Sequence, residues 1–427
     1  MADAAAINKA ADIILSDRDR KYAVVSAPGK RNGRDEKVTD LLYAAQKAAA
    51  DTGDCGSVFC KIEERFTGIC ADLELKLDIT AELAKIKSDI NGGADAHYAA
   101  SRGEYLSAKI FAARLGFDFI DADKIVKFYA DGTFDAEHTN DLAARELARH
   151  KYAVIPGFYG SLPSGVIRTF SRGGSDISGA IIARAARAAL YENWTDVSGF
   201  MVCDPKIVAN PQKIDSLTYK ELRELSYMGA AVLHPESIFP VRKAEIPINI
   251  RNTFSPADAG TMIIPSKEYE HDEKRTITGI AGLKDFLSIN IEKSMMNSEV
   301  GFARKVLSVL EHFNVSFEHM PSGIDTMSVI IDGSSVGERM LAGIIERLKA
   351  VVSPDNIEVV ANLALSATVG HGMSRKKGTA ARLFEALGAA DINVRMIDQG
   401  SSELNIIVAV DNSDFEKTIK AIYGAFC

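Results

Sequence analysis

Residues 170–178 read FSRGGSDIS, and an Ala-, Ile- and Arg-rich helical pattern follows them directly. The two glycines allow a tight turn at the start of that helix, where free N–H groups and the positive end of the helix dipole attract anions. Arg172 offers a planar fork suited to a carboxylate or a phosphate. Asp176 can cap the helix or orient a lysine. A glycine turn without a binding role is the alternative.

Strand and helix patterns alternate on both sides of this loop. Predicted strands are 21–26, 117–122, 152–160, 197–204 and 247–253; predicted helices are 2–15, 38–51, 78–90, 101–116, 139–150 and 176–191, with a polar region at 51–76. Strands that alternate with helices indicate an α/β fold in which a mostly parallel sheet is covered by helices on both faces. This pattern continues to about residue 265.

A repeat follows the charged connector 266–275. The helix expected after Gly301 and the strand at 314–317 recur, at an offset of 77 residues, as a helix after Gly378 and a strand at 392–394. Six apolar positions match, which predicts a duplicated βαββαβ unit. A strand at 276–283 can complete the second copy and nest the first copy inside it. The expected domains are therefore 1–265, 285–358, and 276–284 together with 359–427, with 266–275 as a linker.

Composition restricts the class of protein. The 427 residues carry a net charge of −8, which argues against nucleic acid or an anionic membrane as the main partner. The five cysteines are odd in number and form no CxxC, which favours free thiols in a reducing cytoplasm over disulfides or a zinc site. No metal site is expected. The sequence shows no membrane span and no signal-peptide layout.

Three further loops carry polar residues where ligands bind in open α/β sheets. In SAPGK (26–30), Gly29 lets the backbone approach an anion and Lys30 adds charge, or the stretch is simply a tight turn. In SRGE (101–104), Glu104 either stabilises the start of a helix through a favourable interaction with the helix dipole, or accepts a hydrogen bond from a substrate amine. TDVSGFMVCDPK (195–206) offers groups for a nucleotide, or a turn at Asp204-Pro205. His234 is expected to be structural.

No P-loop and no protein-kinase HRD motif occurs, so a phosphate site here requires another phosphoryl-transfer fold. Taken in order, six motifs resemble the aspartate kinase family: VVSAPGK, SRGEYLSAKI, FSRGGSDIS, TDVSGFMVCDPKIV, LTYKELRELSYMGAAVLHPESI and IPINIRNTFSPADAGTMI. The carboxy-terminal repeat resembles that family's two nested, ferredoxin-like ACT domains. The resemblance implies an amino-acid kinase fold that transfers the γ-phosphoryl group of ATP, with Mg²⁺ carried by the nucleotide, to the β-carboxylate of L-aspartate.

The resemblance also implies residue roles. Arg172 and Asp176 would act in catalysis, Asp176 by holding a phosphate-bridging lysine. The residues implied for aspartate are Glu104, Arg172 and Thr39; those for the nucleotide are Ser26, Gly29, Gly173, Gly174, Thr195, Asp196 and Lys206. A free amino acid, lysine or alternatively threonine, would inhibit from a site between the ACT domains of a homodimer or larger oligomer. Its implied contacts are Met296, Ser298, Gly301, Phe302, Ser316, Glu318 and Asp325.

The chain departs from the family pattern at two places. The family usually opens with a strand and a KFGGSS-like loop that supplies a phosphate-binding lysine, whereas this sequence begins at MADAAAINKAADIIL. Impaired catalysis is therefore expected, and a non-catalytic ACT-containing regulatory subunit from an internal start is the alternative function. Ala231 stands where the family usually has a lysine. A third possibility is another amino-acid kinase, such as an acetylglutamate or uridylate kinase, but those enzymes would not contain two ACT repeats.

Overall fold

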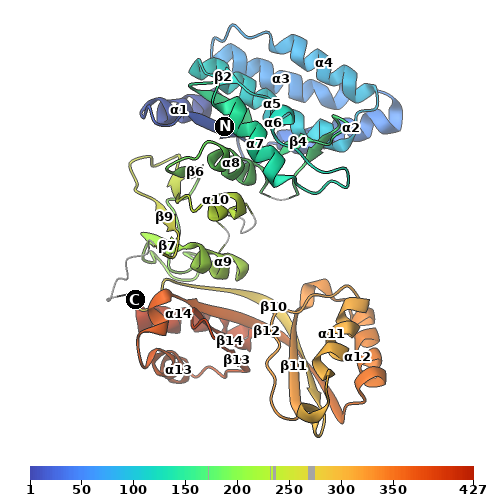
Figure 1. Cartoon of the computed structure of the whole chain (residues 1–427), viewed down its shortest axis with the longest axis vertical. Helices are drawn as coiled ribbons and strands as arrows, with labels where there is room; N and C mark the ends of the chain where they lie inside the picture. The colour runs from blue at the N-terminus through green and yellow to red at the C-terminus, as the bar shows by residue number, and fades with distance from the viewer. Residues whose placement is uncertain (172, 231, 234–236, 268–274) are drawn as a thin grey trace. The chain divides into compact units, whose positions relative to one another are not determined.

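The computed structural model describes residues 1–171, 173–230, 232–233, 237–267 and 275–427. Figure 1 labels its helices and strands. The chain forms two compact units, each with its own core. The first comprises Met1–Gly199 and Val232–Lys267, and the second comprises Phe200–Ala231 and Glu268–Cys427.

The first unit is mixed α/β. Its helices are α1 (Ala4–Leu15), α2 (Val38–Thr52), α3 (Gly56–Asp72), α4 (Ile79–Asn91), α5 (Ala96–Leu115), α6 (Ala122–Ile125), α7 (Ala136–Leu147), α8 (Gly174–Ala185) and α10 (Phe239–Lys243). Its strands are β1 (Tyr22–Val25), β2 (Asp118–Phe119), β3 (Ala153–Pro156), β4 (Tyr159–Ser161), β5 (Ile167–Thr169), β6 (Tyr191–Thr195), β8 (Ile248–Asn252) and β9 (Thr261–Ile264).

Parallel pairing organises this unit. The strand order β1-β3-β2 is parallel throughout, and Tyr22 pairs with Ala153. A second parallel pair joins β6 to β8, and β8 pairs antiparallel with β9. The parallel arrangement expected from the alternating pattern is therefore present.

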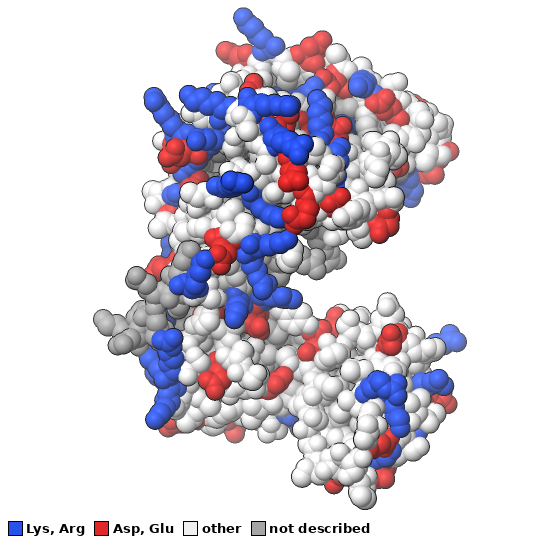
Figure 2. Space-filling model, in the orientation of Figure 1, with Lys and Arg blue, Asp and Glu red and all other residues white. Residues whose placement is uncertain are grey.

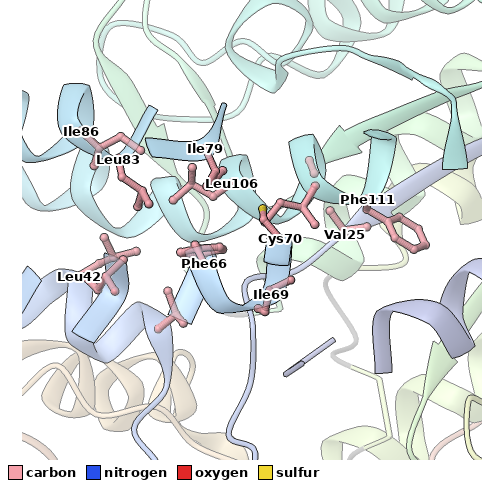
Figure 3. Packing of buried hydrophobic residues seen from close by; sticks show 14 of the residues in the cluster. Val25, Leu42, Phe66, Ile69, Cys70, Ile79, Leu83, Ile86, Leu106 and Phe111 are labelled. Carbon is pink, nitrogen blue, oxygen red and sulfur yellow. The ribbon is translucent and has the colours of Figure 1, made fainter. Parts of the chain in front are cut away.

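A layer of helices covers one side of β1-β3-β2. Helices α2 to α5 bury a continuous apolar cluster that includes Leu42, Phe66, Leu83 and Leu106 (Figure 3). A separate cluster joins β3 to α8 through residues such as Ile155 and Ile181. Apolar residues at helical spacing thus fasten helices to both sides of the strands.

Three expectations for this unit were wrong. The region 51–76 holds helix α3, because Phe59, Ile62, Phe66 and Ile69 recur at helical spacing and are all buried. Residues 101–104 lie inside α5, which begins at Ala96 after the N-cap residue Asp95. No strand covers 197–204.

The chain at 197–204 cannot continue as a regular strand. Gly199 has φ +93, and a Cβ at that position would lie 2.2 Å from Thr261 Oγ1. The strand of this region is β6, which ends earlier, at Thr195. Glu192 and Trp194 lie on the same face of β6, where Arg20 pairs with Glu192 and Arg251 lies over the Trp194 ring.

The second unit is built on one five-stranded sheet. Its helices are α9 (Tyr219–Tyr227), α11 (Phe302–His312), α12 (Glu338–Val352), α13 (Thr379–Ala389) and α14 (Phe415–Phe426), with short 3₁₀ turns η1 (Met296–Ser298), η2 (Gly333–Ser335), η3 (His371–Ser374) and η4 (Asn412–Asp414). Its strands are β7 (Ser216–Thr218), β10 (Gly279–Glu292), β11 (Thr326–Asp332), β12 (Asn356–Val369), β13 (Met396–Asp398) and β14 (Asn405–Asp411).

Two long strands connect the two copies of the repeat. The sheet order is β11-β10-β12-β14-β13, and all pairs are antiparallel. Gly279–Leu283 of β10 pair with Leu365–Val369, whereas Phe286–Glu292 pair with Asn356–Leu363. The strand expected at 276–283 is therefore the first part of a longer strand. It pairs in the second copy, as the nesting hypothesis requires.

The strands expected at 314–317 and 392–394 are absent. Residues 315–317 form a loop, and the chain after this loop pairs with β11 through isolated bridges at His319 and Ser322. The second copy pairs at β13 instead. Short apolar runs such as these carry too little periodicity to separate a strand from a packed loop.

Positive and negative side chains lie beside one another on the visible face of each unit (Figure 2). This mixture agrees with the modest net charge of −8. It is the usual surface of a globular protein that does not bind polyanions.

Candidate active site

The carboxyl ends of β1 and β3 bring two glycine-bearing loops together. β1 leads into Ser26–Lys30, and β3 leads into Gly157. The Gly157 N–H donates to Val25 O at 2.9 Å, so the two loops leave the sheet side by side. Ser26 is exposed and Gly29 is half-buried. Both therefore lie at the edge where open α/β sheets bind ligands.

Glu104 is a buried acid beside the first of these loops. It lies in the middle of α5 and is only 6% exposed. Loss of hydration raises the pKa of Glu104 to about 7, although a hydrogen bond from the Ala27 backbone opposes the rise. Among the described residues, Oε2 of Glu104 has no hydrogen-bond partner. A buried carboxyl group with an open oxygen is suited to bind a cation such as an ammonium group.

Gly103 is the point where α5, α2 and the first loop meet. A Cβ on Gly103 would lie 2.8 Å from the Ala27 Cβ and within 3.6 Å of Val38. Thr39 follows Val38 in the first turn of α2 and is half-buried. Glycine at residue 103 thus allows the close approach that gathers Thr39, the Ser26–Gly29 loop and Glu104 in one region.

The amino end of α8 packs against the end of β3. The N-cap residue Gly173 has φ +62, a left-handed conformation that glycine adopts without strain. A Cβ on Gly174 would lie 2.3 Å from the Phe158 ring, so only glycine fits there. The Phe158 N–H donates to the Ser178 hydroxyl at 2.9 Å. The free N–H groups of this helix end therefore lie close to the loop that follows β3.

Asp176 is connected to β6. The Asn193 side-chain amide donates to its Oδ1 at 2.9 Å, and the Tyr191 hydroxyl donates to its backbone oxygen at 3.2 Å. The sequence did not reveal either partner, because polar residues inside a short strand are equally compatible with a face of the strand that is exposed to solvent. Arg172, the neighbour expected to bind a carboxylate, lies outside the described residues, as do Ala231 and His234.

Two of the residues expected at the nucleotide, Thr195 and Asp196, lie at the carboxyl end of β6, beside the end of β8. Thr195 ends β6, and its hydroxyl donates to Asp196 Oδ1 at 3.2 Å. Beside them, the Asn252 amide donates to Ser198 Oγ at 2.9 Å, and that hydroxyl donates to Asp258 at 2.5 Å. The last three residues were not expected, and they make this strand end a polar cluster.

Lys206 belongs to the second unit. Its N–H donates to Asp204 Oδ1 at 2.8 Å, so the alternative reading of Asp204-Pro205 as a turn holds locally. The role of the Lys206 side chain towards a nucleotide stays a prediction.

A buried arginine that sequence reasoning missed supports the first loop. Arg65 of α3 is 6% exposed, and its Nη1 donates to Gly29 O at 3.2 Å. Its Nη2 donates to Asp35 at 2.5 Å. Arg65 is an arginine on the otherwise apolar face of α3, and this pattern could have indicated its role. It was not recognised because helix α3 was not predicted.

Known proteins match this chain over its whole length. The Amino acid kinase family matches residues 1–252, and the ACT domain family matches residues 367–426. Aspartokinase 3 of Bacillus subtilis (strain 168) is 35% identical over 443 residues, which cover 100% of this chain and 96% of that protein. The chain belongs to the aspartokinase family. It is a kinase with an amino-acid kinase fold and carboxy-terminal ACT domains, as the sequence motifs indicated.

Solved aspartokinases share the whole fold. The aspartate kinase of Clostridium acetobutylicum is 50% identical with a TM-score of 0.96, over 100% of this chain and 98% of that chain. E. coli aspartokinase III in complex with aspartate and ADP is 26% identical with a TM-score of 0.75, over 99% of this chain and 97% of that chain. The same E. coli protein, in complex with lysine and aspartate, is 25% identical with a TM-score of 0.75, over 100% and 97% of the two chains.

Four of the expected effector residues lie around the start of α11. Gly301 is the N-cap residue of α11, with φ +81. Met296 and Phe302 are buried in the core of the first repeat copy, so their side chains support the loop from beneath. The Met295 N–H donates to Asp325 Oδ1 at 2.8 Å, which ties the turn before α11 to the turn before β11. Ser298 is the last residue of η1, in the turn before α11.

Two expected effector residues lie on the segment before β11. Ser316 is exposed and Glu318 is half-buried. The Tyr227 hydroxyl at the end of α9 hydrogen-bonds to Glu318 Oε2. Burial, together with that hydrogen bond, raises the pKa of Tyr227 to about 12. Helix α9 therefore contacts the carboxylate expected to meet an effector.

Two features are absent from the described residues. No group of three or more His, Cys, Asp or Glu side chains there could hold a metal ion. No helix in the described part of the chain is long and apolar enough to cross a membrane.

Proposed function

We propose that this enzyme transfers the γ-phosphoryl group of ATP to the β-carboxylate of L-aspartate. The product is 4-phospho-L-aspartate, from which lysine, threonine and methionine are made. The observation that carries the proposal is the buried Glu104 carboxyl group with its open oxygen, located where two parallel strands end. The E. coli relative with aspartate and ADP supports both substrates.

Glu104 accepts hydrogen bonds from the substrate ammonium group, beside Thr39. Arg172 binds a substrate carboxylate. The N–H groups at Gly173 and Gly174, together with the loop from Ser26 to Gly29, surround the phosphates. The nucleotide contacts are Thr195, Asp196 and Lys206. Mg²⁺ enters bound to the nucleotide.

The chemistry requires alignment more than acid–base catalysis. The aspartate β-carboxylate is already ionised at neutral pH, so its oxygen attacks without a general base. Phosphoryl transfer then depends on holding that oxygen in line and on neutralising charge on the moving group. Backbone N–H groups at the start of α8 can supply that stabilisation. Asp176, held by Asn193, presents a carboxylate suited to orient a phosphate-bridging lysine, but the KFGGSS-like loop that supplies this lysine in the family does not occur in the sequence, so impaired catalysis stays part of the proposal.

Regulation is by a free amino acid, with lysine first and threonine as the alternative. The contacts are Ser298, Gly301, Ser316, Glu318 and Asp325, above the buried Met296 and Phe302. The effector's side-chain ammonium meets Glu318 or Asp325. The E. coli relative in complex with lysine and aspartate supports lysine.

The same region suits pairing of two chains. A surface hollow of about 480 Å³ lies beside α11, lined in part by Leu307, Val315 and Phe317. Phe317, which lines the hollow, is 43% exposed. Elsewhere in the first repeat copy, Ile324 and Val300 are 70% and 96% exposed. Exposed apolar side chains are typical of a contact surface. We infer a homodimer or larger oligomer formed through the first ACT domain.

Trapping of acyl phosphate as a hydroxamate tests the reaction directly. Glu104→Gln is expected to raise the KM for aspartate at least ~10-fold and to leave the KM for ATP within about 2-fold, because it removes an ionic contact to one substrate only. Arg172→Ala should act in the same way. Glu385→Gln, at an exposed glutamate, is the matched control for the loss of a carboxylate. An ATP-only defect would overturn both assignments.

A thermal shift with lysine separates the enzyme from the alternative function. Ligand binding to the folded state raises the Tm. Lysine-dependent stabilisation without acyl phosphate formation would favour a regulatory subunit. No shift with lysine or threonine would remove the effector proposal.

A further inference from the structure

Arg65 is a buried cation that joins helix α3 to the loop after β1. Its guanidinium group reaches three partners. Nη1 donates to Gly29 O at 3.2 Å and to Ala2 O at 3.3 Å, and Nη2 donates to Asp35 Oδ2 at 2.5 Å. A planar guanidinium group with five donors can bridge partners on different segments, whereas a lysine ammonium group acts as a single point charge.

The loop between β1 and α2 closes on the same carboxylate. The Arg31 N–H donates to Asp35 Oδ2 at 2.9 Å, and the Arg31 guanidinium group donates to both Asp35 oxygens at 3.1 Å. At the end of the loop, the Val38 N–H donates to Pro28 O at 3.5 Å. Only 11% of the Asp35 side chain is exposed, so its pair with Arg65 is weakly screened by solvent and salt.

A second ion pair joins α3 to the same loop, but this pair lies at the surface. Lys61 Nζ lies 2.7 Å from Glu36 Oε2, and the two side chains are 56% and 58% exposed. Exposed pairs of this kind contribute little to stability. In the described part of the chain, Lys61 makes no hydrogen bond to residues 26–30. The two pairs therefore connect the same two elements, and only the Arg65 pair is buried and bonded to the backbone of the loop.

The bond from Arg65 fixes the orientation of the peptide group between Gly29 and Lys30. This peptide bond is trans and planar, so its C=O and N–H groups point in opposite directions. Since Gly29 O faces Arg65, the Lys30 N–H points away from α3. No group in the described part of the chain accepts a hydrogen bond from that N–H. An open N–H group in a loop at the carboxyl end of a parallel strand is available to an anion.

We propose that Arg65 is a positioning residue for the phosphate-binding loop: paired with Asp35 and bonded to Gly29 O, its guanidinium group holds the Lys30 N–H in the orientation that receives a phosphate group of the nucleotide. This inference rests on the proposed binding of ATP. Arg65 does not touch the nucleotide and acts through the main chain of residues 29 and 30. Without it the peptide group can rotate, and binding must then restore the lost order.

The test compares Arg65→Met and Asp35→Asn, which break the buried pair from either side, with Lys61→Met, the matched control for loss of an α3 cation. Calorimetric titration with Mg·ATP in the absence of aspartate measures nucleotide binding and needs no turnover. Hydrogen exchange of residues 29–38 measures the order of the loop. Arg65→Lys keeps the charge but lacks the planar fork that bridges Gly29 O and Asp35.

Arg65→Met and Asp35→Asn should each weaken ATP binding about 5- to 10-fold, because a hydrogen bond to a charged phosphate loses its prepared orientation. Exchange of the Arg31 N–H, which donates to Asp35, should become at least ~10-fold faster. Arg65→Lys should recover part of the ATP affinity that Arg65→Met loses. Lys61→Met should agree with the parent within about 1.5-fold in both measurements, as expected for an exposed pair.

A purely structural role for Arg65 would speed exchange of the loop and lower the Tm but leave the ATP affinity unchanged, and that result would overturn the proposal. Unchanged exchange in both variants would overturn it as well. Asp35 lies outside α3, so Asp35→Asn decides the matter if Arg65→Met does not fold. A parent protein that does not bind ATP would contradict the proposed function and this inference with it, whereas ATP binding that is equal in parent and variants contradicts only the role of Arg65.

Discussion

The Thr278 hydroxyl donates a 2.6 Å hydrogen bond to Glu221 Oε1, and this bond joins α9 to the start of the β10 region. The same oxygen accepts the His371 N–H at 2.9 Å, while Oε2 accepts the Thr218 N–H and hydroxyl. Glu221 is fully buried. Residue 221 lies in the range matched by the Amino acid kinase family, yet this network makes it part of the unit that carries the ACT sheet.

Replacement of Glu221 should destabilise the second unit strongly. Glu221→Ala leaves four buried donors without their acceptor, which corresponds to about 3–5 kcal/mol of unfolding free energy. Urea unfolding and hydrogen exchange across β10 measure the loss. Glu385→Ala removes an exposed glutamate of α13 in the same unit and should change stability by less than about 0.5 kcal/mol. Similar losses in both variants would mean that the network contributes little.

Gly103→Ala should disturb the substrate region, whereas Gly68→Ala should not. The added Cβ at residue 103 meets the Ala27 Cβ at 2.8 Å, and such overpacking costs about 1–3 kcal/mol. It also separates Ala27 from Glu104, so the aspartate KM should rise. Gly68, inside α3, has nothing within 4 Å of its Cβ position, and alanine there should stabilise by about 0.5–1 kcal/mol. Thermal unfolding and steady-state kinetics of the pair decide this prediction.

Glu104→Gln should stabilise the protein at high pH. The folded-state pKa of about 7 lies above the usual 4.5, so the folded state binds more protons between these values. Stability therefore falls as pH rises through that window, and the penalty approaches about 3.5 kcal/mol at pH 8 (about 2.5 pKa units at about 1.4 kcal/mol each).

Glutamine does not ionise, so the stability difference between Glu104→Gln and the parent should grow from pH 5 to pH 8. Denaturant unfolding at the two pH values measures it, with Glu385→Gln as the control. A difference that does not change with pH would show that Glu104 titrates normally.

Asn193→Ala should lower kcat about 10-fold and change the aspartate KM little. The side chain holds Asp176 through a 2.9 Å hydrogen bond, and misplaced phosphoryl-transfer groups reduce the chemical step more than binding. Asn193→Asp replaces the donor with a like charge and should be worse. Hydroxamate-trapping kinetics check both variants, and a KM effect without a kcat effect would contradict the positioning role.

Tyr227→Phe should tighten lysine binding about 5- to 13-fold. The Tyr227 hydroxyl is hydrogen-bonded to Glu318, and the effector ammonium group must replace that bond, which is worth about 1–1.5 kcal/mol. Calorimetric titration with lysine measures the change, and activity without lysine should stay as in the parent. Tyr129→Phe, at an exposed tyrosine of the first unit, is the control. Weaker lysine binding would instead make Tyr227 part of the effector site.

Local pattern explains most of what was predicted correctly. The strands at 21–26 and 152–160 and the helix at 38–51 carry clear β-branched runs or helical spacing, and they occur as β1, β3 and α2. Helix α3 was missed because Cys, Gly and Thr residues dilute a regular apolar face. The glycine turn predicted at 101–104 is absent, because these residues lie inside α5. Gly103 instead allows α5 to pack closely against the loop at Ala27.

The sequence by itself determined the order of strands and helices, the repeat, the family motifs and which residue types could bind anions and amines. Only the tertiary structure decided that Glu104 is buried with an open oxygen, that Asn193 holds Asp176, and that Glu221 joins the ACT sheet. The reason is physical. Periodicity and turn chemistry act between near neighbours in the chain, whereas burial, and with it the pKa of a carboxyl group, depends on contacts such as those between residues 27 and 104 or 221 and 278.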